Sequence, residues 1–427
     1  MIHIIGGGTF SHVRNHLALA APAFGKTASA IEWLFEFAFR EDPTYDPNPF
    51  EFDDSHRVEL HLTKMACTSS NLVTNQDVAD LVDRLVADPK TRVIIMNVAL
   101  CDYDAHVVPL PGEYSEQSGS HAKRLKTSEG DRVLRLSPAD KIISRIRQTR
   151  KDIFLVAFKT TTDATSDEQY LAGLHLLKAN SANLVLANDT VTRNNMVVTP
   201  EEARYHETTD RDAALKGLVD IILSRMTNTF TRSTVVEGDA VPWDSPDVPS
   251  NLRAVVDHCI AAGAYKLFRG ATVGHFATRL GKNSILTSAR KHDFNRLAEQ
   301  GMVRVDYQDG NSVTAVGRKP SVGGMSQRII FEQHPDADCI VHAHVPLRPN
   351  APDVIPHAPQ WPNECGSHQC GLNTSQGLQE VSTGIKAVML DNHGPNIVFG
   401  RNVPARDVIA FIERNFDLSD KTGGLVS

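Results

Sequence analysis

The chain has 427 residues, of which 41% are hydrophobic and 22% are charged, and its formal net charge is -7. The length predicts two or three domains, and the composition is ordinary for a globular protein in water. The negative charge argues against nucleic acid or a membrane surface as the main partner, and no apolar run approaches the ~20 residues needed to span a bilayer. The N-terminus lacks signal-peptide features and the six cysteines are scattered, so we expect reduced thiols and a cytoplasmic location.

The N-terminal half alternates apolar strands with amphipathic helices. Strands are expected at 2–5, 57–62, 92–100, 152–161 and 182–189, and helices at 27–40, 76–89, 167–180 and 212–226. This alternation predicts a parallel sheet with helices on both faces, a Rossmann-like α/β domain that we place at residues 1–232. Ligands of such sheets bind at the carboxyl ends of the strands.

The stretch Gly25-Lys26-Thr27 looks like the end of a phosphate-binding P-loop. A P-loop requires a glycine five residues before Gly25, and the chain has Ala20 there. We therefore interpret Gly25-Lys26 as the start of a helix, and we expect the glycines after the first strand to hold phosphate instead.

Four short motifs follow one another in the N-terminal half. They are "GGT" at residues 7–9, "NVALCDYDA" at 97–105, the basic stretch "HAKRLKTSEGD" at 121–131 and "AND" at 187–189. In combination and order they resemble the phosphopantothenoylcysteine synthetase family, over about residues 1–230. The resemblance implies activation of a carboxylate by a nucleoside triphosphate, CTP or else ATP with Mg²⁺, followed by attack of an amine on an acyl-nucleotide.

The resemblance also implies roles for individual residues. It places Asn97 at the acyl-transfer centre, where a neutral amide can stabilise an oxyanion. The implied nucleotide and triphosphate contacts are Gly6, Gly7, Gly8, Thr9, Lys123, Lys126, Phe158, Asn188 and Asp189. Other interpretations remain open, because Asn97 can cap a strand end, the lysines can belong to a solvated loop and Asn188-Asp189 can form a turn.

Two departures concern the substrate of this half. The family's arginine-glutamate after the glycine turn is replaced by the apolar stretch "FSHVRNHLALAAPAF", and Thr161 stands where the family has a glutamate. We therefore expect an acyl substrate other than phosphopantothenate.

Residues 233–250 contain three prolines and several acidic residues, which predicts a linker before a second domain at 251–427. In this domain helices are expected at 251–269, 326–335 and 404–418, and strands at 283–290, 303–310, 312–318, 339–346 and 386–400. The short strands at hairpin spacing predict a layer of helices and a sheet rich in antiparallel pairs.

The stretch "HPDADCIVHAHVP" places His342 and His344 on one face of a strand, a spacing that suits a zinc-like divalent ion. His393 is the expected third ligand. These histidines resemble the class II aldolase/adducin family over about residues 251–420, which implies an α/β/α fold, and "SILTSAR" resembles its phosphate-handling turn, which implies phosphate contacts for Thr287 and Ser288. The alternative is a domain that kept the fold and lost the metal.

The acid/base group of that family is missing. Its glutamate falls on Gly323, and no acidic residue lies between Val322 and Phe331. The segment "NECGSHQCG" at residues 363–371 offers Glu364 and His368 as replacement proton-transfer groups, and its cysteines as metal ligands or a thiolate. The simpler interpretation is a flexible loop that carries two ordinary thiols.

Three hypotheses about function follow. The first is a bifunctional enzyme that joins a ligase to a metal-dependent aldolase, lyase, epimerase or dehydratase acting on small-molecule substrates. The second makes one domain catalytic and the other a binding or oligomerisation module. The third is a scaffold without activity, which the three retained histidines argue against. Both resembled families are oligomers, so we expect a homo-oligomer, either a dimer or a tetramer.

Overall fold

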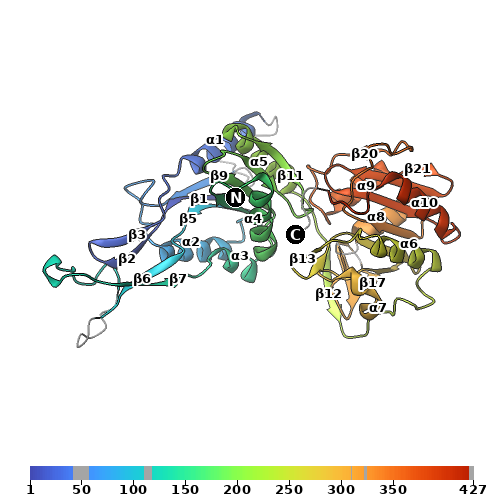
Figure 1. Cartoon of the computed structure of the whole chain (residues 1–427), viewed down its shortest axis with the longest axis horizontal. Coiled ribbons are helices and arrows are strands. Elements are labelled where there is room, and N and C mark those ends of the chain that lie inside the picture. The colour runs from blue at the N-terminus through green and yellow to red at the C-terminus, as the bar shows by residue number, and fades with distance from the viewer. Residues whose placement is uncertain (42–56, 110–117, 309, 322–324, 423–427) are drawn as a thin grey trace. The chain divides into compact units, whose positions relative to one another are not determined.

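The computed structural model describes residues 1–41, 57–109, 118–308, 310–321 and 325–422 (Figure 1). It divides the chain into two compact units. The first comprises Met1–Ala164, Ala172–Val197 and His206–Asp220, and the second comprises Thr165–Leu171, Val198–Tyr205 and Ile221–Ser427. Within the described ranges, no helix is long and apolar enough to cross a membrane.

The N-terminal sheet has seven strands in the order β11-β10-β9-β8-β5-β1-β4. The pairs β1–β4, β1–β5, β5–β8 and β8–β9 are parallel, as the alternating pattern predicts. The strands are β1 (Ile2–Gly8), β4 (Val58–Leu62), β5 (Val93–Ala99), β8 (Phe154–Thr161), β9 (Leu184–Asp189), β10 (Asn195–Val198) and β11 (Arg204–Thr208). The helices are α1 (Lys26–Glu41), α2 (Asn75–Ala87), α3 (Ile143–Thr149), α4 (Ser166–Asn180) and α5 (Arg211–Arg225).

Helices cover both faces of this sheet, with α1 and α5 on one side and α2, α3 and α4 on the other (Figure 1). The α/β class predicted for this half is thus confirmed. Numbered along the chain, the five parallel strands have the order 2-1-3-4-5, so the chain reverses direction across the sheet between β1 and β5. Ligands of doubly wound sheets bind beside such a reversal, outside the carboxyl ends of the strands.

Two hairpins extend from this sheet and were not predicted from the sequence. They are formed by β2 (Phe10–Arg14) with β3 (Leu17–Ala20) and by β6 (Tyr103–Val107) with β7 (Leu134–Pro138). Buried Val13, Ala105 and Val107 pack between them, and Ser11 Oγ donates to Asp104 Oδ1 at 2.8 Å. The apolar stretch after Thr9 therefore serves, in part, to hold one hairpin against the other.

The C-terminal sheet has ten strands, nine of them in the order β12-β18-β17-β16-β15-β19-β23-β22-β20, and β21 pairs with β22. Its pairs are antiparallel except β12–β18 and β20–β22. The longer strands are β12 (Arg232–Val236), β15 (His275–Arg279), β16 (Ser284–Thr287), β17 (Val303–Tyr307), β18 (Ser312–Val316), β19 (Cys339–His342), β21 (Gln379–Ser382), β22 (Ile385–Leu390) and β23 (Gly394–Phe399). Two-residue strands are β13 (Leu267–Phe268), β14 (Ala271–Thr272) and β20 (His357–Ala358), and the helices are α6 (Ser250–Ala261), α7 (Leu297–Gln300), α8 (Met325–Gln333), α9 (His368–Gly377) and α10 (Ala405–Asn415).

This sheet is covered on both faces, because alternate residues of its strands enter two different cores. Phe276 packs in the core that contains residues of α6 and α10. The next residue, Ala277, packs in the core that contains residues of α8 and α9. The predicted α/β/α architecture is therefore confirmed.

The segment 233–250, expected to be a linker, is packed into the second unit. Strand β12 begins it and pairs with β18, and Val241 forms a bridge with Met302. Trp243 and Val248 are buried in the core. The prolines and acidic residues suggested a free connection, but the apolar residues between them bury enough surface to attach the segment.

Gly6 allows α1 to approach β1 closely, and this yields a test of the packing. A Cβ at Gly6 would lie 2.3 Å from Ala28 Cβ of α1. We expect Gly6→Ala to lower the free energy of unfolding by roughly 1–3 kcal/mol, because helix and strand must move apart. Gly281→Ala is the control, since a Cβ there meets nothing within 4 Å. Chemical denaturation would measure both, and equal stability of the two variants would contradict the expectation.

Candidate functional sites

Most of the residues predicted to handle the nucleotide lie at the carboxyl edge of the N-terminal sheet. Gly6 of β1 pairs with Asn97 of β5, so the glycine turn and the expected acyl-transfer residue are neighbours. Phe158 of β8 lies one position beyond the pair Met96↔Ala157, and Asn188 follows on β9. Asn97 is partly exposed. The register thus places Gly6 and Asn97 beside the β1/β5 reversal, and Phe158 and Asn188 on the next two strands of the same edge.

Thr9 lies at the same edge but is fully buried, and its hydroxyl is occupied within the protein. Its Oγ1 donates to Asn75 Oδ1 at 2.7 Å and accepts from the Cys101 N–H at 3.1 Å. Gly6, Gly7 and Gly8 are buried as well. These residues make a tight junction between β1, α1 and the following loops. Their expected role as phosphate contacts stays a prediction.

Asp189 is also used internally. Its carboxylate accepts backbone N–H groups of Ala164 at 3.1 Å and Thr192 at 2.8 Å, and the Thr161 hydroxyl at 2.8 Å. Burial raises the pKa of this carboxyl, but these hydrogen bonds outweigh it and hold the pKa below its ordinary value. Asp189 therefore ties together the loops after β8 and β9. Its expected place in the nucleotide pocket stays a prediction.

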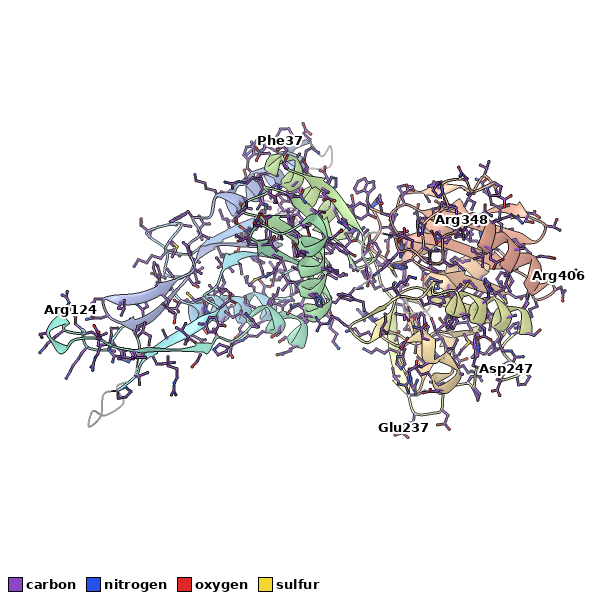
Figure 2. The ribbon with its side chains drawn as sticks, viewed as in Figure 1. Phe37, Arg124, Glu237, Asp247, Arg348 and Arg406 are labelled. Carbon is purple, nitrogen blue, oxygen red and sulfur yellow. The ribbon has the colours of Figure 1, made fainter. Side chains whose placement is uncertain are left out.

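The predicted triphosphate lysines are not brought to the strand edge. Lys123 and Lys126 are exposed on the connection between β6 and β7. Arg124, between the two lysines, lies near the tip of this β6–β7 connection, at the far left of Figure 2. In the described part of this unit, Lys123 and Lys126 therefore belong to a solvated loop.

A cleft of about 540 Å³ opens where the hairpins meet the start of α2. This volume lies within the range of small-molecule sites. Its lining includes Ser11, His12, Asn75, Asp104 and Arg145. The Nδ1 atom of His12 is buried and has no hydrogen-bond partner among the described residues. The sequence did not reveal this cleft, because its walls come from segments far apart in the chain.

In the second unit, His342, His344 and His393 form one buried group. One ligand nitrogen of each lies within 4.8 Å of the others. His342 Nε2 and His393 Nε2 are 3.2 Å apart. His342 Nδ1 donates to the Pro395 carbonyl at 2.8 Å, so its Nε2 carries the lone pair. Burial lowers the pKa of His342 to about 4, which keeps the ring neutral at neutral pH.

Two further side chains border this group. His275 of β15 pairs with His342 across the sheet, and the two ring centres are 4.9 Å apart. Gln327 of α8 donates its amide to His275 Nδ1 at 3.1 Å. Its Oε1 is buried and has no hydrogen-bond partner among the described residues. Neither His275 nor Gln327 was assigned a role from the sequence.

Thr287 and Ser288, expected to contact phosphate, are fully buried. Thr287 Oγ1 donates to the Phe276 carbonyl at 3.3 Å, and Ser288 Oγ donates to Ser321 Oγ at 3.0 Å. Both hydroxyls stabilise the turn after β16. Their expected contact with phosphate stays a prediction.

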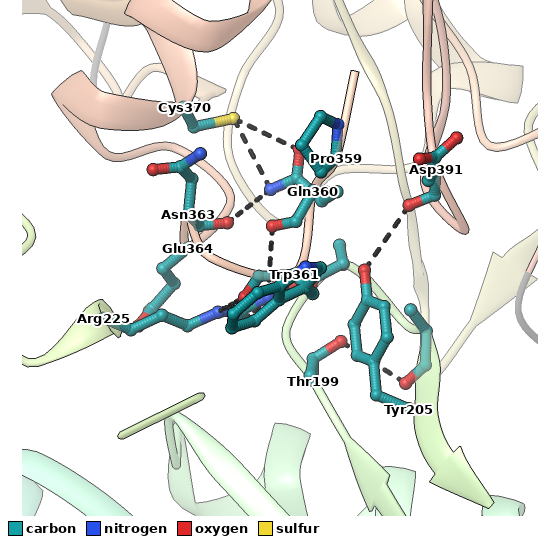
Figure 3. A network of polar contacts seen from close by, with 12 residues as sticks. Thr199, Tyr205, Arg225, Pro359, Gln360, Trp361, Asn363, Glu364, Cys370 and Asp391 are labelled. Atoms are coloured by element: carbon teal, nitrogen blue, oxygen red, sulfur yellow. Dashed lines mark hydrogen bonds and ion pairs between the residues drawn. The ribbon is translucent and has the colours of Figure 1, made fainter. Parts of the chain in front are cut away.

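The expected proton-transfer residues Glu364 and His368 are not members of the three-histidine group. Glu364 is buried near Arg225 (Figure 3), and His368 Nε2 lies 3.2 Å from Thr231 Oγ1. Gly323, the position of the family's glutamate, lies outside the described residues. Among the described side chains, the structure therefore places no carboxylate with the histidines.

The segment 363–371 includes the start of a helix and makes internal hydrogen bonds. Ser367 caps α9, which begins at His368, and Gln360 contacts both Asn363 and Cys370 (Figure 3). Burial raises the pKa of the Cys370 thiol, so a thiolate is disfavoured there.

Residues 253–416 match the family model of the class II aldolase and adducin N-terminal domain. The predicted resemblance of the C-terminal half is thereby confirmed. No curated protein matches the chain in sequence.

Solved structures with similarity to parts of the chain include two proteins named for pantothenate or coenzyme A metabolism, and an aldolase. The DNA/pantothenate metabolism flavoprotein from Streptococcus pneumoniae is 20% identical, with 52% of this chain and 98% of that chain covered and a TM-score of 0.41. The C-terminal domain of the coenzyme A biosynthesis bifunctional protein CoaBC is 19% identical, with 52% of this chain and 91% of that chain covered and a TM-score of 0.33. L-fuculose 1-phosphate aldolase is 20% identical, with 40% of this chain and 82% of that chain covered and a TM-score of 0.30.

A buried ion pair holds the segment before α9 in place. Arg225 Nη2 lies 2.6 Å from Glu201 Oε1, and neither side chain is exposed. Arg225 Nε also donates to the Trp361 carbonyl at 2.8 Å (Figure 3). Burial opposes the charged guanidinium, but the Glu201 carboxylate raises the pKa of Arg225.

We expect Arg225→Met to lower the free energy of unfolding by roughly 3–5 kcal/mol, because it leaves a buried carboxylate without its partner. Lys216→Met on the same helix is the control. Its ion pair with Asp220 is exposed, so a loss of about 0.5 kcal/mol or less is expected. Urea denaturation would compare the two variants, and similar losses would refute a special role for the buried pair.

Proposed function

We propose that the chain is a bifunctional enzyme. Its first unit would activate a carboxylate with CTP, or else ATP, in the presence of Mg²⁺ and couple it to an amine. Its second unit would use a divalent metal, with zinc as the expected ion, in an aldolase, lyase, epimerase or dehydratase reaction on a small molecule. The buried three-histidine group carries the proposal for the second unit, and the alignment of Gly6 with Asn97 supports the first.

The residues of the second unit fit a divalent ion. A tetrahedral ion with bonds of 2.0–2.1 Å holds its ligand atoms about 3.3 Å apart, and the Nε2 atoms of His342 and His393 are separated by 3.2 Å. The Pro395 carbonyl accepts a hydrogen bond from His342 Nδ1 and orients the ring, as acceptors behind metal-binding histidines do. His342, His344 and His393 would hold the ion, which when bound would polarise substrate oxygens as a Lewis acid.

The chain's own groups beside the histidines would orient a substrate. Gln327 presents a buried carbonyl oxygen that lacks a partner among the described residues, so it can accept a hydrogen bond from a substrate hydroxyl. The amide of the same side chain donates to His275 and thereby fixes the orientation of both. Burial lowers the pKa of His275 well below its ordinary value, so this ring stays neutral.

In the first unit, the proposal assigns the reacting centre to Asn97. Its partly exposed amide lies at the carboxyl edge beside the glycine turn, where it can donate to an oxyanion that develops during acyl transfer. Thr9 and Asp189 would position the surrounding loops from inside the protein.

Metal binding by the second unit can be tested on the full chain. We expect His342→Ala and His393→Ala each to lose about one equivalent of bound Zn²⁺ per chain, because each removes one of three ligands. His258→Ala is the control, since this half-buried residue of α6 pairs with Glu413 at 3.3 Å. Elemental analysis after dialysis against Zn²⁺ would measure the content, and an unchanged content in both variants would sink the metal proposal.

The ligase proposal can be tested with nucleotide. We expect CTP or ATP with Mg²⁺ to bind in calorimetry, and Asn97→Ala to bind it with similar affinity. The variant should release pyrophosphate about 10²–10³ times more slowly in the presence of accepted acids and amines, because an oxyanion donor is lost. Asn71→Ala, at an exposed position, is the control. If neither CTP nor ATP binds, the proposal is refuted.

One observation favours a second candidate function, in which only the N-terminal unit is catalytic. The described structure places no carboxylate with the histidines, and Glu364 lies with Arg225 instead. The second unit would then bind a ligand or assemble copies of the chain. The Asn97→Ala and His342→Ala variants assayed in parallel discriminate, because only the first would then abolish turnover.

A further inference from the structure

Three side chains outside the sites described above gather near the beginning of β1. His3 lies on β1, and Glu59 and His61 lie on the neighbouring edge strand β4. His3 pairs directly with Glu59 in the parallel register. Because side chains alternate along a strand, Glu59 and His61 share the face on which His3 lies. His3 is three residues before Gly6, or roughly 10 Å along the strand, so this group is separate from the carboxyl edge.

Their donor atoms have the spacing of ligands around one ion. His3 Nδ1 lies 3.2 Å from His61 Nε2 and 3.5 Å from Glu59 Oε2. His61 Nε2 lies 3.9 Å from Glu59 Oε2. The edge of a tetrahedron with metal–ligand bonds of 2.0–2.1 Å is about 3.3 Å, so small side-chain movements would bring all three atoms to one centre. Two imidazoles and one carboxylate form a ligand set known from zinc and non-haem iron sites.

A second layer of contacts orients two of the three ligands. Thr91 Oγ1 lies 3.3 Å from the other ring nitrogen of His3, Nε2. In the tautomer where Nε2 donates to Thr91, the lone pair of Nδ1 faces Glu59 and His61. Arg57 holds the other carboxylate oxygen, Glu59 Oε1, at 2.8 Å and leaves Oε2 for the group. Contacts of this kind fix the ligands of metal sites.

We propose that His3, Glu59 and His61 bind a divalent transition-metal ion such as Zn²⁺, and that this ion joins edge strand β4 to β1. The side chain of His3 is 1% exposed, whereas that of Glu59 is 28% exposed. The side chain of His61 is 21% exposed. The ion therefore has a protein-facing side and a side open to water, which would complete its coordination.

The test uses the full chain with the His342→Ala substitution, so that the three-histidine group does not contribute to the number of Zn²⁺ ions bound per chain. After removal of metal with a chelator, this protein is titrated with Zn²⁺ and its stoichiometry is measured by calorimetry and elemental analysis. About one tight equivalent should remain. Adding His61→Ala or Glu59→Gln should abolish it, whereas adding His175→Ala, an exposed histidine of α4, should leave it intact.

A conservative variant separates metal binding from folding. Thr91→Val removes only the contact to His3 Nε2, and we expect it to weaken Zn²⁺ binding about 10–100-fold. Circular dichroism without metal verifies that each variant is folded, and Zn²⁺ should raise the melting temperature of the His342→Ala protein but not that of its Glu59→Gln derivative. The proposal is overturned if the His342→Ala protein binds no Zn²⁺, or if folded Glu59→Gln and His61→Ala derivatives bind it unchanged.

Discussion

The hydrogen-bond register of β1 is the constraint on which the N-terminal unit depends. Strand β1 pairs in parallel with β4 on one side and β5 on the other. The pairing with β5 sets Gly6 opposite Asn97, and the pairing with β4 sets His3 opposite Glu59. A shift of one residue would turn every side chain of β1 to the other face and separate both groups. One strand thus positions the residues of both proposed sites, one near each of its ends.

In the C-terminal unit, β19 plays the corresponding part between β15 and β23. Its last residue, His342, meets His393 because the chain closes tightly around the strand end. Gly394 has φ of 137°, and a Cβ there would lie 2.1 Å from the Ala343 carbonyl oxygen. Only glycine permits this approach, so the histidine-glycine pair in the sequence reflects a packing requirement as well as a proposed ligand.

Helices and strands were predicted from the sequence more reliably than the roles of single polar residues. Hydrophobic periodicity predicted most helices and strands of both sheets, because burial imposes the same periods on any chain. The roles of individual polar residues were less predictable. Thr9, Asp189 and Ser288 sit at the ends of strands, as ligand-binding residues do, but they close loops and turns inside the protein. A hydroxyl or carboxylate that satisfies buried N–H groups cannot be told in sequence from one that awaits a ligand.

The sequence by itself determined the two α/β architectures, the helix that begins at Lys26, and the choice of the three histidines. These follow from local periods of 2 and 3.6 residues and from glycine chemistry, which need no long-range information. The strand expected at 339–346 is shorter than predicted, because β19 ends at His342 and His344 lies just beyond it. Only the tertiary structure decided that Glu364 lies with Arg225, that the hairpins enclose a cleft, and that His3 meets Glu59 and His61. Strand order and the packing of distant segments set these contacts, and neither is encoded in the spacing of residues along the chain.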